Sequence, residues 1–429
     1  MDNNRKIAFD ILIDIEKNQA YSNIALNKHL AKNKELNLNQ GFIRELVYGV
    51  LENKMYLDYL LSKLITRPMV KNKTELGTIM RMGIYQIDYM NSVPDYAAVD
   101  ECVNLVNKLY KAQGSFINGV LRNYLRKKGE ILLTQEGKTI AEYLSIKYSH
   151  AKWIVDYWLE FYDVAFVEGL LAEDNKSPMI CIRANSLKIK KEELIRVLTD
   201  KGYEIFEGKL VSEAIYIKGN SLLDESLFKE GAFSVQDESS MLAVKSLGPL
   251  LGEFIIDTCA APGGKSLYIA ELMSNEGTIV DFDIHDHKLK LIEKSAKKNG
   301  VEIIKTEIWN SKSINQEYIG KANKVIVDAP CSGLGVLRRK PELKYKGSLD
   351  SVNELSMIQY EMLESSSNYL IEKGVLLYCT CTISIKENQN VTEKFLNNNS
   401  NFSLVEETQL FPNVNNTDGF YICKMIKNS

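Results

Sequence analysis

The stretch EFIIDTCAAPGGKS, at residues 253–266, combines a short apolar run with a glycine turn and the start of a helix. Its first half is typical of a buried strand, and Gly263 and Gly264 predict a turn. Two glycines allow the backbone to approach a ligand closely, and a helix amino terminus favours a carboxylate or phosphate. The glycine spacing matches neither the phosphate loop of nucleotide hydrolases nor the dinucleotide-binding loop. The stretch therefore predicts a strand, a ligand-binding turn and a helix.

The same alternation of strand and helix runs from about residue 230 onward. Further apolar runs lie at 277–284, 323–330 and 374–381, and helical stretches lie between them at 288–300 and 351–374. This pattern is typical of a parallel sheet covered by helices, so we predict an α/β, Rossmann-like domain over residues 231–429. In such sheets ligands bind beyond the carboxyl ends of the strands. The candidate site residues all fall at these ends.

An acidic residue ends the run at 277–284. Asp283 lies about 20 residues beyond the glycine turn, where a carboxylate can accept hydrogen bonds from ribose hydroxyls. It fits this role for any nucleoside-containing cofactor. Taken alone, it could equally be the N-cap of the next helix.

Thiols end two later strands. Asp328 and Cys331 follow one apolar run, and Cys379 and Cys381 end the next. A single free cysteine is usually buried and inert, but two at strand ends, beside an Asp and a glycine turn, favour a catalytic site. A redox or metal role for Cys379 and Cys381 is disfavoured, because no further ligand cluster accompanies them. We expect Cys379 to be structural and to face away from Cys381.

The first part of the chain is predicted to be helical. Ile7, Ile11, Leu12 and Ile15 share one helical face, which is typical of a core-facing helix. We therefore predict an all-α bundle over residues 1–130.

A basic cluster lies on the last helix of this bundle, for which Ser115 is the expected N-cap. Its members are Arg122, Arg126, Lys127 and Lys128. These side chains could contact phosphates. Alternatively, they could be exposed to solvent at the end of the helix, where cations interact favourably with the helix dipole. On this stretch alone we favour the solvated helix end.

Two shorter segments follow the bundle. Residues 131–176 are predicted to form a helical linker, in which Trp153, Tyr157 and Trp158 favour core packing over base stacking. Residues 177–230 change to strand and helix patterns and predict a small α+β, RNA-recognition-like unit.

The composition is that of a globular protein, with 45% hydrophobic and 25% charged residues. The net charge of −3 gives no global sign of a nucleic-acid partner, so any basic footprint must be local. No apolar run is long enough to span a membrane, and the charged start has no signal-peptide core, so we expect a cytoplasmic protein. Its seven cysteines are then expected to be reduced, and no metal site is predicted.

The motifs DTCAAPGGKS, VDAPCSGLG and YCTCT resemble those of the RNA 5-methylcytosine methyltransferases, the NOL1/NOP2/Sun family. The helical amino-terminal region resembles the NusB-type RNA-binding bundle. GAFSVQDESSMLA and RRKPELK are also similar to the family, so that the resemblance covers nearly the whole chain. The bacterial Sun/Fmu type is most similar, which implies a cytosine of 16S ribosomal RNA as the target.

The resemblance implies S-adenosylmethionine as the cofactor. Its methionine part would be held by Cys259, Ala260, Ala261, Pro262, Gly263, Gly264 and Lys265. Asp283 would hold the ribose, with Asp281 as a rival, and Asp328 would lie near the cofactor, the methyl-transfer centre and the base. The family usually has an acidic residue at the adenine end, which residues 305–310 lack; Glu307 or Asn310 might replace it.

The chemistry explains the thiols. Cytosine C5 is a poor nucleophile, and attack of a thiolate on C6 makes C5 able to accept a methyl group. By resemblance Cys381 attacks, Cys331 assists product release and Asp328 hydrogen-bonds N3 of the base. A thiol needs only a modest fall from its ordinary pKa of about 8.5 to supply thiolate. The group that removes the C5 proton is left open, and the target must be an unpaired or flipped cytosine.

Three other functions compete with this reading. The first is the same chemistry on transfer RNA, which the NusB-type bundle disfavours. The second is a noncatalytic RNA-binding assembly factor, which Cys331 and Cys381 disfavour and the altered residues 305–310 favour. The third is a DNA methyltransferase, but those enzymes resemble this chain less and attack through the cysteine of the Pro-Cys motif.

Overall fold

The computed structural model describes residues 2–65, 73–110, 113–218, 222 and 225–429. Residue contacts divide the chain into two compact units, of which unit 1 is Met1–Lys176 with Leu337–Lys346, and unit 2 is Ser177–Val336 with Gly347–Ser429. Within the described ranges, no helix is long and apolar enough to cross a membrane. The predicted fold classes are confirmed, and the four domain boundaries stay a prediction.

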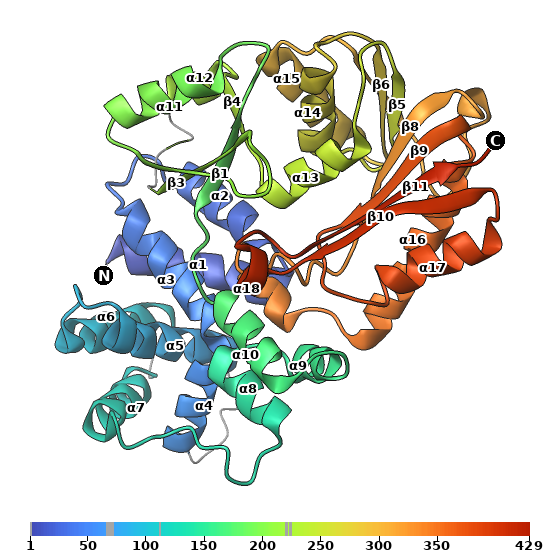
Figure 1. The fold of residues 1–429 in the computed structure, drawn as a ribbon. Helices are drawn as coiled ribbons and strands as arrows, with labels where there is room; N and C mark the ends of the chain where they lie inside the picture. The colour runs from blue at the N-terminus through green and yellow to red at the C-terminus, as the bar shows by residue number, and fades with distance from the viewer. Residues whose placement is uncertain (1, 66–72, 111–112, 219–221, 223–224) are drawn as a thin grey trace. The chain divides into compact units, whose positions relative to one another are not determined.

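Unit 1 consists of helices (Figure 1). They are α1 (Asn3–Asn18), α2 (Ser22–Lys32), α3 (Gln40–Glu52), α4 (Lys54–Leu64), α5 (Lys73–Tyr89), α6 (Asp95–Leu109), α7 (Gly114–Lys127), α8 (Ile140–Tyr148), α9 (Lys152–Leu159), α10 (Val164–Glu173) and the short 3₁₀ helix η3 (Pro341–Tyr345). The predicted apolar face of α1 is buried, and so are Tyr157 and Trp158 of α9. The prediction for α1 is confirmed, and that for α9 is confirmed at Tyr157 and Trp158, whereas Trp153 is partly exposed.

Helix α7 begins two residues earlier than predicted, at Gly114. Its N-cap is Gln113, which makes no side-chain capping bond, so the expected N-cap at Ser115 is wrong. The backbone at Gly114 passes so close to α6 that a Cβ there would lie 2.1 Å from the Asn107 Oδ1. A glycine is therefore required in this first turn, where the helix packs against α6. In the basic cluster, Arg122 Nε donates to Asn118 Oδ1 at 2.9 Å, and Lys128 Nζ donates to the Ile87 carbonyl at 2.9 Å.

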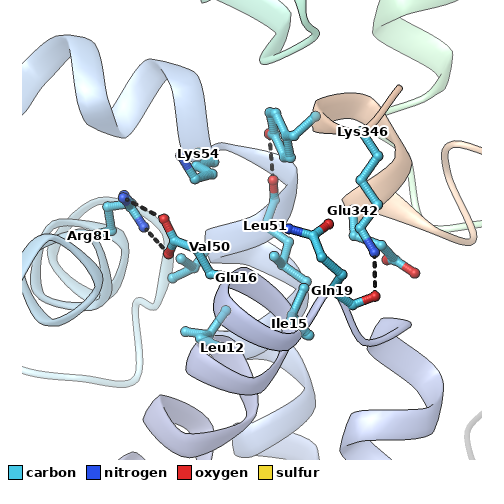
Figure 2. A pocket seen from close by; sticks show the side chains of 11 residues that line it. Leu12, Ile15, Glu16, Gln19, Val50, Leu51, Lys54, Arg81, Glu342 and Lys346 are labelled. Atoms are coloured by element: carbon cyan, nitrogen blue, oxygen red, sulfur yellow. Dashed lines mark hydrogen bonds and ion pairs between the residues drawn. The ribbon is translucent and has the colours of Figure 1, made fainter. Parts of the chain in front are cut away.

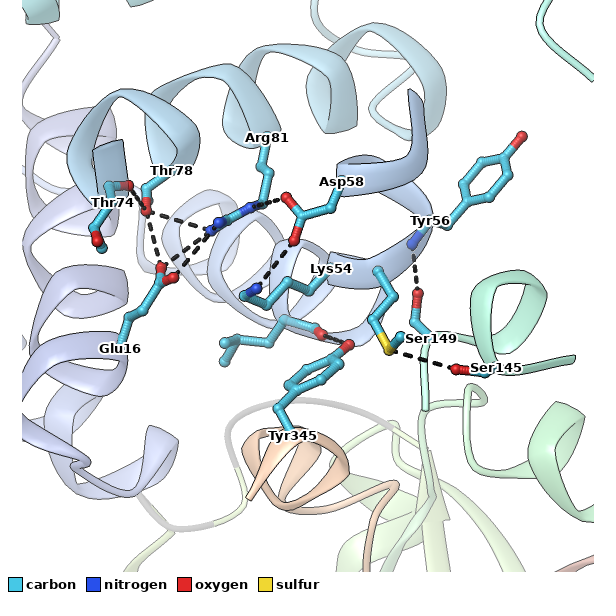
Figure 3. Close-up of polar contacts among 12 residues, drawn as sticks. Glu16, Lys54, Tyr56, Asp58, Thr74, Thr78, Arg81, Ser145, Ser149 and Tyr345 are labelled. Carbon is cyan, nitrogen blue, oxygen red and sulfur yellow. Dashed lines mark hydrogen bonds and ion pairs between the residues drawn. The ribbon is translucent and has the colours of Figure 1, made fainter. Parts of the chain in front are cut away.

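A buried arginine joins three helices of unit 1 (Figure 3). Arg81 of α5 is 7% exposed; its Nε donates to Asp58 Oδ1 of α4 at 2.7 Å, and its guanidinium also donates to Glu16 Oε2 of α1 at 3.0 Å. A buried cation needs such partners, because desolvation without them is costly. The arginine therefore fixes the packing of the first, fourth and fifth helices.

The segment Leu337–Lys346, which follows the Cys331 motif, packs in unit 1. The Tyr345 hydroxyl donates to the Leu51 carbonyl at 2.6 Å, and the Ala151 N–H donates to the Lys344 carbonyl at 2.9 Å. A cavity of about 230 Å³ lies beside it, lined by Leu12, Ile15, Val50, Leu51, Glu16, Gln19, Lys54, Arg81, Glu342, Tyr345 and Lys346 (Figure 2). The RRKPELK motif thus supplies packing to the helical unit.

Unit 2 begins with a small antiparallel sheet in the order β2-β3-β1-β4. Its elements are β1 (Ile180–Ala184), α11 (Lys191–Asp200), β2 (Glu204–Glu207), β3 (Ala214–Lys218), α12 (Ser226–Lys229) and β4 (Phe233–Val235). Leu194 and Leu198 of α11 are fully buried with Ile182, Ile215 and Phe233. This is the α+β unit that the sequence predicts.

The larger sheet of unit 2 has the order β10-β11-β9-β8-β5-β6-β7. Its elements are α13 (Glu238–Leu247), β5 (Phe254–Asp257), α14 (Gly264–Leu272), β6 (Thr278–Asp283), α15 (Asp286–Asn299), β7 (Ile304–Ile308), η2 (Gln316–Tyr318), β8 (Ala322–Asp328), α16 (Leu349–Ser367), β9 (Leu370–Thr380), α17 (Gln389–Asn398), β10 (Phe402–Leu410), α18 (Pro412–Asn415) and β11 (Phe420–Lys427). Strands β5 to β9 are parallel, whereas β10 and β11 add an antiparallel edge. The parallel strands bring their carboxyl ends to one edge.

A buried ion pair connects the small sheet to the larger domain. The Arg183 guanidinium, from β1, lies 4.0 Å from the centre of the Tyr268 ring and pairs with Glu271 of α14. Its Nε donates to Gln236 Oε1 at 3.0 Å. Arg183 is completely buried and Glu271 is 4% exposed, so each charge depends on the other.

Replacing Arg183 should therefore destabilise unit 2 strongly. We expect Arg183→Met to lower the free energy of unfolding by about 3–5 kcal/mol, because it leaves a buried carboxylate without its cation. The double variant Arg183→Met/Glu271→Met should recover much of this loss. Urea unfolding followed by tryptophan fluorescence and circular dichroism measures both. A loss below about 1 kcal/mol for the single variant would show that the pair contributes little.

Candidate active site

The turn between β5 and α14 is shaped by Asp257 and Gly263. Asp257 Oδ1 accepts from the Cys259 N–H at 3.1 Å, and its Oδ2 accepts from the Ser266 hydroxyl at 3.1 Å. Gly263 has a φ of +95°, which favours glycine, and a Cβ there would lie 3.2 Å from Ile292 side-chain carbons. Burial, with Asp328 adding to it, raises the pKa of Asp257 to about 7. The loop thus presents backbone groups beside the amino terminus of α14.

The structure distinguishes the two acidic residues at the end of β6. Asp281 is completely buried and pairs in register with Asp257, so its carboxylate has no access to a ribose. Asp283 is the last residue of β6 and is partly exposed. Its Oδ1 accepts from the His285 N–H at 2.9 Å, and the N-cap of α15 is His285 rather than Asp283. Asp283 is therefore the acidic residue of the two that a cofactor can reach.

The adenine-end candidates lie at the end of β7. Glu307 accepts a hydrogen bond from the Tyr318 hydroxyl. Asn310 is exposed in the loop beyond the strand, and its Oδ1 accepts from the Lys312 N–H at 3.1 Å. The Trp309 N–H donates to the Asp283 carbonyl at 3.2 Å, which keeps this loop beside the β6 end. Asn310 is thus better placed than Glu307 to meet a nucleoside bound at Asp283.

A lysine–aspartate pair lies between the cofactor loop and the thiols. Lys265 Nζ donates to Asp328 Oδ2 at 2.5 Å, and Lys265 is only 9% exposed. Burial alone would lower the pKa of Lys265, but the Asp328 carboxylate beside it raises that pKa above its ordinary value. Lys265 is therefore protonated and forms an ion pair with the Asp328 side chain at the end of β8.

The two candidate catalytic thiols lie together. The Sγ atoms of Cys331 and Cys381 are 3.4 Å apart, and both residues are partly exposed. The contact with Cys381 and burial raise the pKa of the Cys331 thiol well above its ordinary value. The Gly335 N–H donates to the Cys381 carbonyl at 3.1 Å, so the loops after β8 and β9 are directly bonded.

The expectation that Cys379 faces away from Cys381 is wrong. Positions two apart in a strand share a face, and the Cys379 Sγ donates to Asp328 Oδ1 at 3.6 Å. Cys379 is completely buried, and burial raises its pKa well above the ordinary value. It lies behind the site as a buried thiol in contact with the Asp328 carboxylate.

The sequence reasoning missed a polar network around the Cys331 loop. The carboxylate of Glu387 accepts from the Ser332 N–H at 2.8 Å and the Ser332 hydroxyl at 2.5 Å. The Ser332 hydroxyl also lies 2.7 Å from the Thr382 hydroxyl. Glu387 is in the polar stretch SIKENQN, where an acidic residue is expected to be exposed to solvent. The sequence pattern therefore gave no indication that Glu387 is completely buried.

These residues fit S-adenosylmethionine. The start of α14 and the backbone of the turn suit its carboxylate, and Asp283 suits the ribose hydroxyls. Gly263 allows the turn to pack against Ile292 in a left-handed conformation, which keeps the backbone of the turn beside the start of α14. The residues that the family resemblance implies for the cofactor thus come together at one edge of the sheet.

Comparison with known proteins gives the same organisation. The family described as 16S rRNA methyltransferase RsmB/F matches residues 244–426, the NusB family matches residues 2–126, and the ferredoxin-like domain of RsmF/B-like methyltransferases matches residues 150–222. A probable ribosomal RNA small subunit methyltransferase B of Bacillus subtilis is 35% identical over 442 residues, which cover 99% of this chain and 98% of that one. One of Synechocystis is 32% identical and covers 91% of this chain and 88% of its own.

A solved structure agrees with this similarity. The crystal structure of a methyltransferase homologue protein from Pyrococcus horikoshii has a TM-score of 0.61 and 25% identity, and the match covers 67% of this chain and 98% of that chain.

Asp283 should govern cofactor affinity. We expect Asp283→Ala to weaken the binding of S-adenosylmethionine about tenfold, because the ribose loses its hydrogen-bond acceptor, a loss of about 1.4 kcal/mol. Asp286→Ala is the matched control, since Asp286 is an exposed residue paired with Lys290, and should change the Kd less than twofold, about 0.4 kcal/mol. Isothermal titration calorimetry measures both. Equal affinity for the two variants would contradict the ribose role.

Proposed function

Because the chain belongs to the 16S rRNA methyltransferase RsmB/F family, we propose that it methylates C5 of a cytosine in 16S ribosomal RNA through a covalent Cys381–C6 adduct. The observation that carries this proposal is the pair of thiols, Cys331 and Cys381, whose sulfur atoms are 3.4 Å apart at adjoining strand ends. A single thiol would be enough for attack, whereas a second one beside it fits a reaction in which the adduct must also be resolved.

S-adenosylmethionine, when bound, supplies the methyl group as an electrophile. Residues 259–265 would bind its methionine part, Asp283 its ribose and Asn310 its adenine end. The last of these takes the place that the family usually gives to an acidic residue. An amide offers both a donor and an acceptor to the adenine edge.

The thiolate of Cys381 would form the bond to C6 of the flipped cytosine, and the electron pair of the C5–C6 double bond would then make C5 nucleophilic. After C5 has taken the methyl group, its proton passes to a base, for which the adjacent Cys331 thiolate and water are the candidates. The S–C6 bond then breaks, its electrons return to the sulfur, and the double bond is restored. Cys331, in contact with the attacking sulfur, would assist this release.

Asp328 would face N3 of the base. Attack at C6 pushes electron density towards N3 and O2, so a nearby proton donor or cation stabilises the adduct. Lys265, bonded to Asp328, supplies both a proton and a positive charge within hydrogen-bond distance of that carboxylate. The pair also lies next to the cofactor loop, which suits a base placed against the methyl group.

The test is methyl transfer from labelled S-adenosylmethionine to protein-free small-subunit ribosomal RNA, with nucleoside analysis. We expect label in 5-methylcytosine for the unmodified protein, and a loss of at least about a thousandfold for Cys381→Ala, because the nucleophile is removed. Cys423→Ala is the control, since this buried thiol of β11 lies opposite Tyr378 and away from the strand ends. Full activity in Cys381→Ala would rule out the assigned nucleophile.

Removing the second thiol should separate attack from release. We expect Cys331→Ala to accumulate a covalent RNA–protein adduct, visible as a slowly migrating band on a denaturing gel, because Cys381 still attacks. The double variant Cys331→Ala/Cys381→Ala should form none. If Cys331→Ala turns over like the unmodified protein without an adduct, Cys331 has no part in release.

A further inference from the structure

A buried carboxylate outside the recognised motifs holds the loop that carries Cys331. Glu387 lies six positions beyond Cys381 and is completely buried. Its Oε1 accepts from the Ser332 N–H at 2.8 Å and from Gln359 Nε2 at 3.0 Å, and its Oε2 accepts from the Ser332 hydroxyl at 2.5 Å. The carboxylate is thus bonded twice to the residue that follows Cys331.

The same network reaches the residue before Cys331. Gln359 Nε2, from α16, also donates to the Pro330 carbonyl at 2.9 Å. Cys331 is therefore held on both sides, through Pro330 and through Ser332. The Ser332 hydroxyl lies 2.7 Å from the Thr382 hydroxyl, which extends the network to the residue after Cys381. Glu387 is the group on which these connections converge.

Burying a carboxylate at this position costs free energy. The three donors around the Cys331 loop and the Ser384 hydroxyl are neutral groups, and burial raises the pKa of Glu387. An ionised carboxylate taken out of water costs several kcal/mol unless its charge is compensated. An amide or an apolar side chain would fill the same space with a smaller desolvation penalty. A buried carboxylate at this position therefore indicates a functional role. The Glu387 charge also contributes to the raised pKa of Cys331, after the Cys381 contact and burial.

We propose that Glu387 is a positioning residue, which holds Cys331 against Cys381 and thereby serves the release of methylated RNA rather than the attack on it. This inference rests on the proposed function. Glu387 has no need to touch the RNA, because it acts through Ser332 and through its charge. Cys381 follows directly on β9, whose pairing with β8 and β11 does not involve the carboxylate, so its attack depends on Glu387 less than the placement of Cys331 does.

Glu387→Ala tests whether the carboxylate holds the Cys331 loop in position. It removes both contacts to Ser332 and frees the Cys331 loop, and a displacement of about 1 Å can slow a step about 100-fold. We expect the breakdown of the Cys381 adduct to slow about 10- to 100-fold, while the first methyl transfer in a single turnover stays within about threefold. Quenched-flow sampling on denaturing gels measures the adduct, and labelled nucleoside measures the transfer.

Glu387→Gln tests the charge. The amide keeps the shape, and its oxygen can still accept from the Ser332 N–H and Gln359. Without the negative charge the pKa of Cys331 falls, so the pH profile of adduct breakdown should shift to lower pH while the melting temperature changes little. Glu407→Gln is the matched control, because it removes a carboxylate of β10 that accepts from the Tyr421 hydroxyl at 2.6 Å; its profile should not move.

The outcomes are distinguishable. Equal slowing of transfer and breakdown in Glu387→Ala would mean a merely structural role and overturn the inference, as would turnover like that of the unmodified protein. If Glu387→Ala does not fold, an unshifted pH profile in Glu387→Gln overturns it. If the unmodified protein makes no 5-methylcytosine, the proposed function fails; if Cys331→Ala accumulates adduct and Glu387→Ala does not, only this inference fails.

Discussion

Strands β8 and β9 are parallel neighbours, with Asp328 in register with Cys379. Their carboxyl ends therefore meet at the same edge of the sheet, and the loops that leave them bring Cys331 and Cys381 into contact. Strand β5 lies on the other side of β8, between it and β6. The cofactor loop and Asp283 thus lie to one side of Asp328 and the thiols to the other. This order suits a reaction in which a methyl group passes between a cofactor and a base.

Buried charges stabilise this arrangement in pairs or in networks. Lys265 neutralises Asp328 between the cofactor loop and the thiols, and Glu387 is satisfied by three donors around the Cys331 loop. Further from the site, Arg183 and Glu271 connect the small sheet to α14. Each of these charges is costly to bury alone, so each constrains where its partner lies. These contacts connect the residues of the active-site edge without any contribution from RNA.

The sequence predicted the classes of fold, the strand ends and the motif residues, because apolar runs and glycine turns are local signals. It favoured Asp283 over its rival Asp281, and the complete burial of Asp281 agrees with that choice. The N-cap predicted at Ser115 is wrong because the helix already includes Gly114, and the packing of Gly114 against Asn107 of α6 gives no local signal in the sequence. Glu387 and the antiparallel β10 and β11 were not foreseen, since a buried carboxylate in a polar stretch and the order of strands depend on contacts between distant residues.

The central claim is that Cys381 forms the bond to C6. The most direct test uses ribosomal RNA in which cytosines carry fluorine at C5, because a fluorine cannot leave as a proton does and the adduct is trapped after methyl transfer. Digestion with nuclease and protease, followed by tandem mass spectrometry, locates the attached nucleotide. The account predicts a methylated fluorocytidine on the peptide that contains Cys381, bonded to that sulfur. Attachment to Cys331 or Cys379, or no attachment under conditions where unsubstituted RNA is methylated, would contradict it.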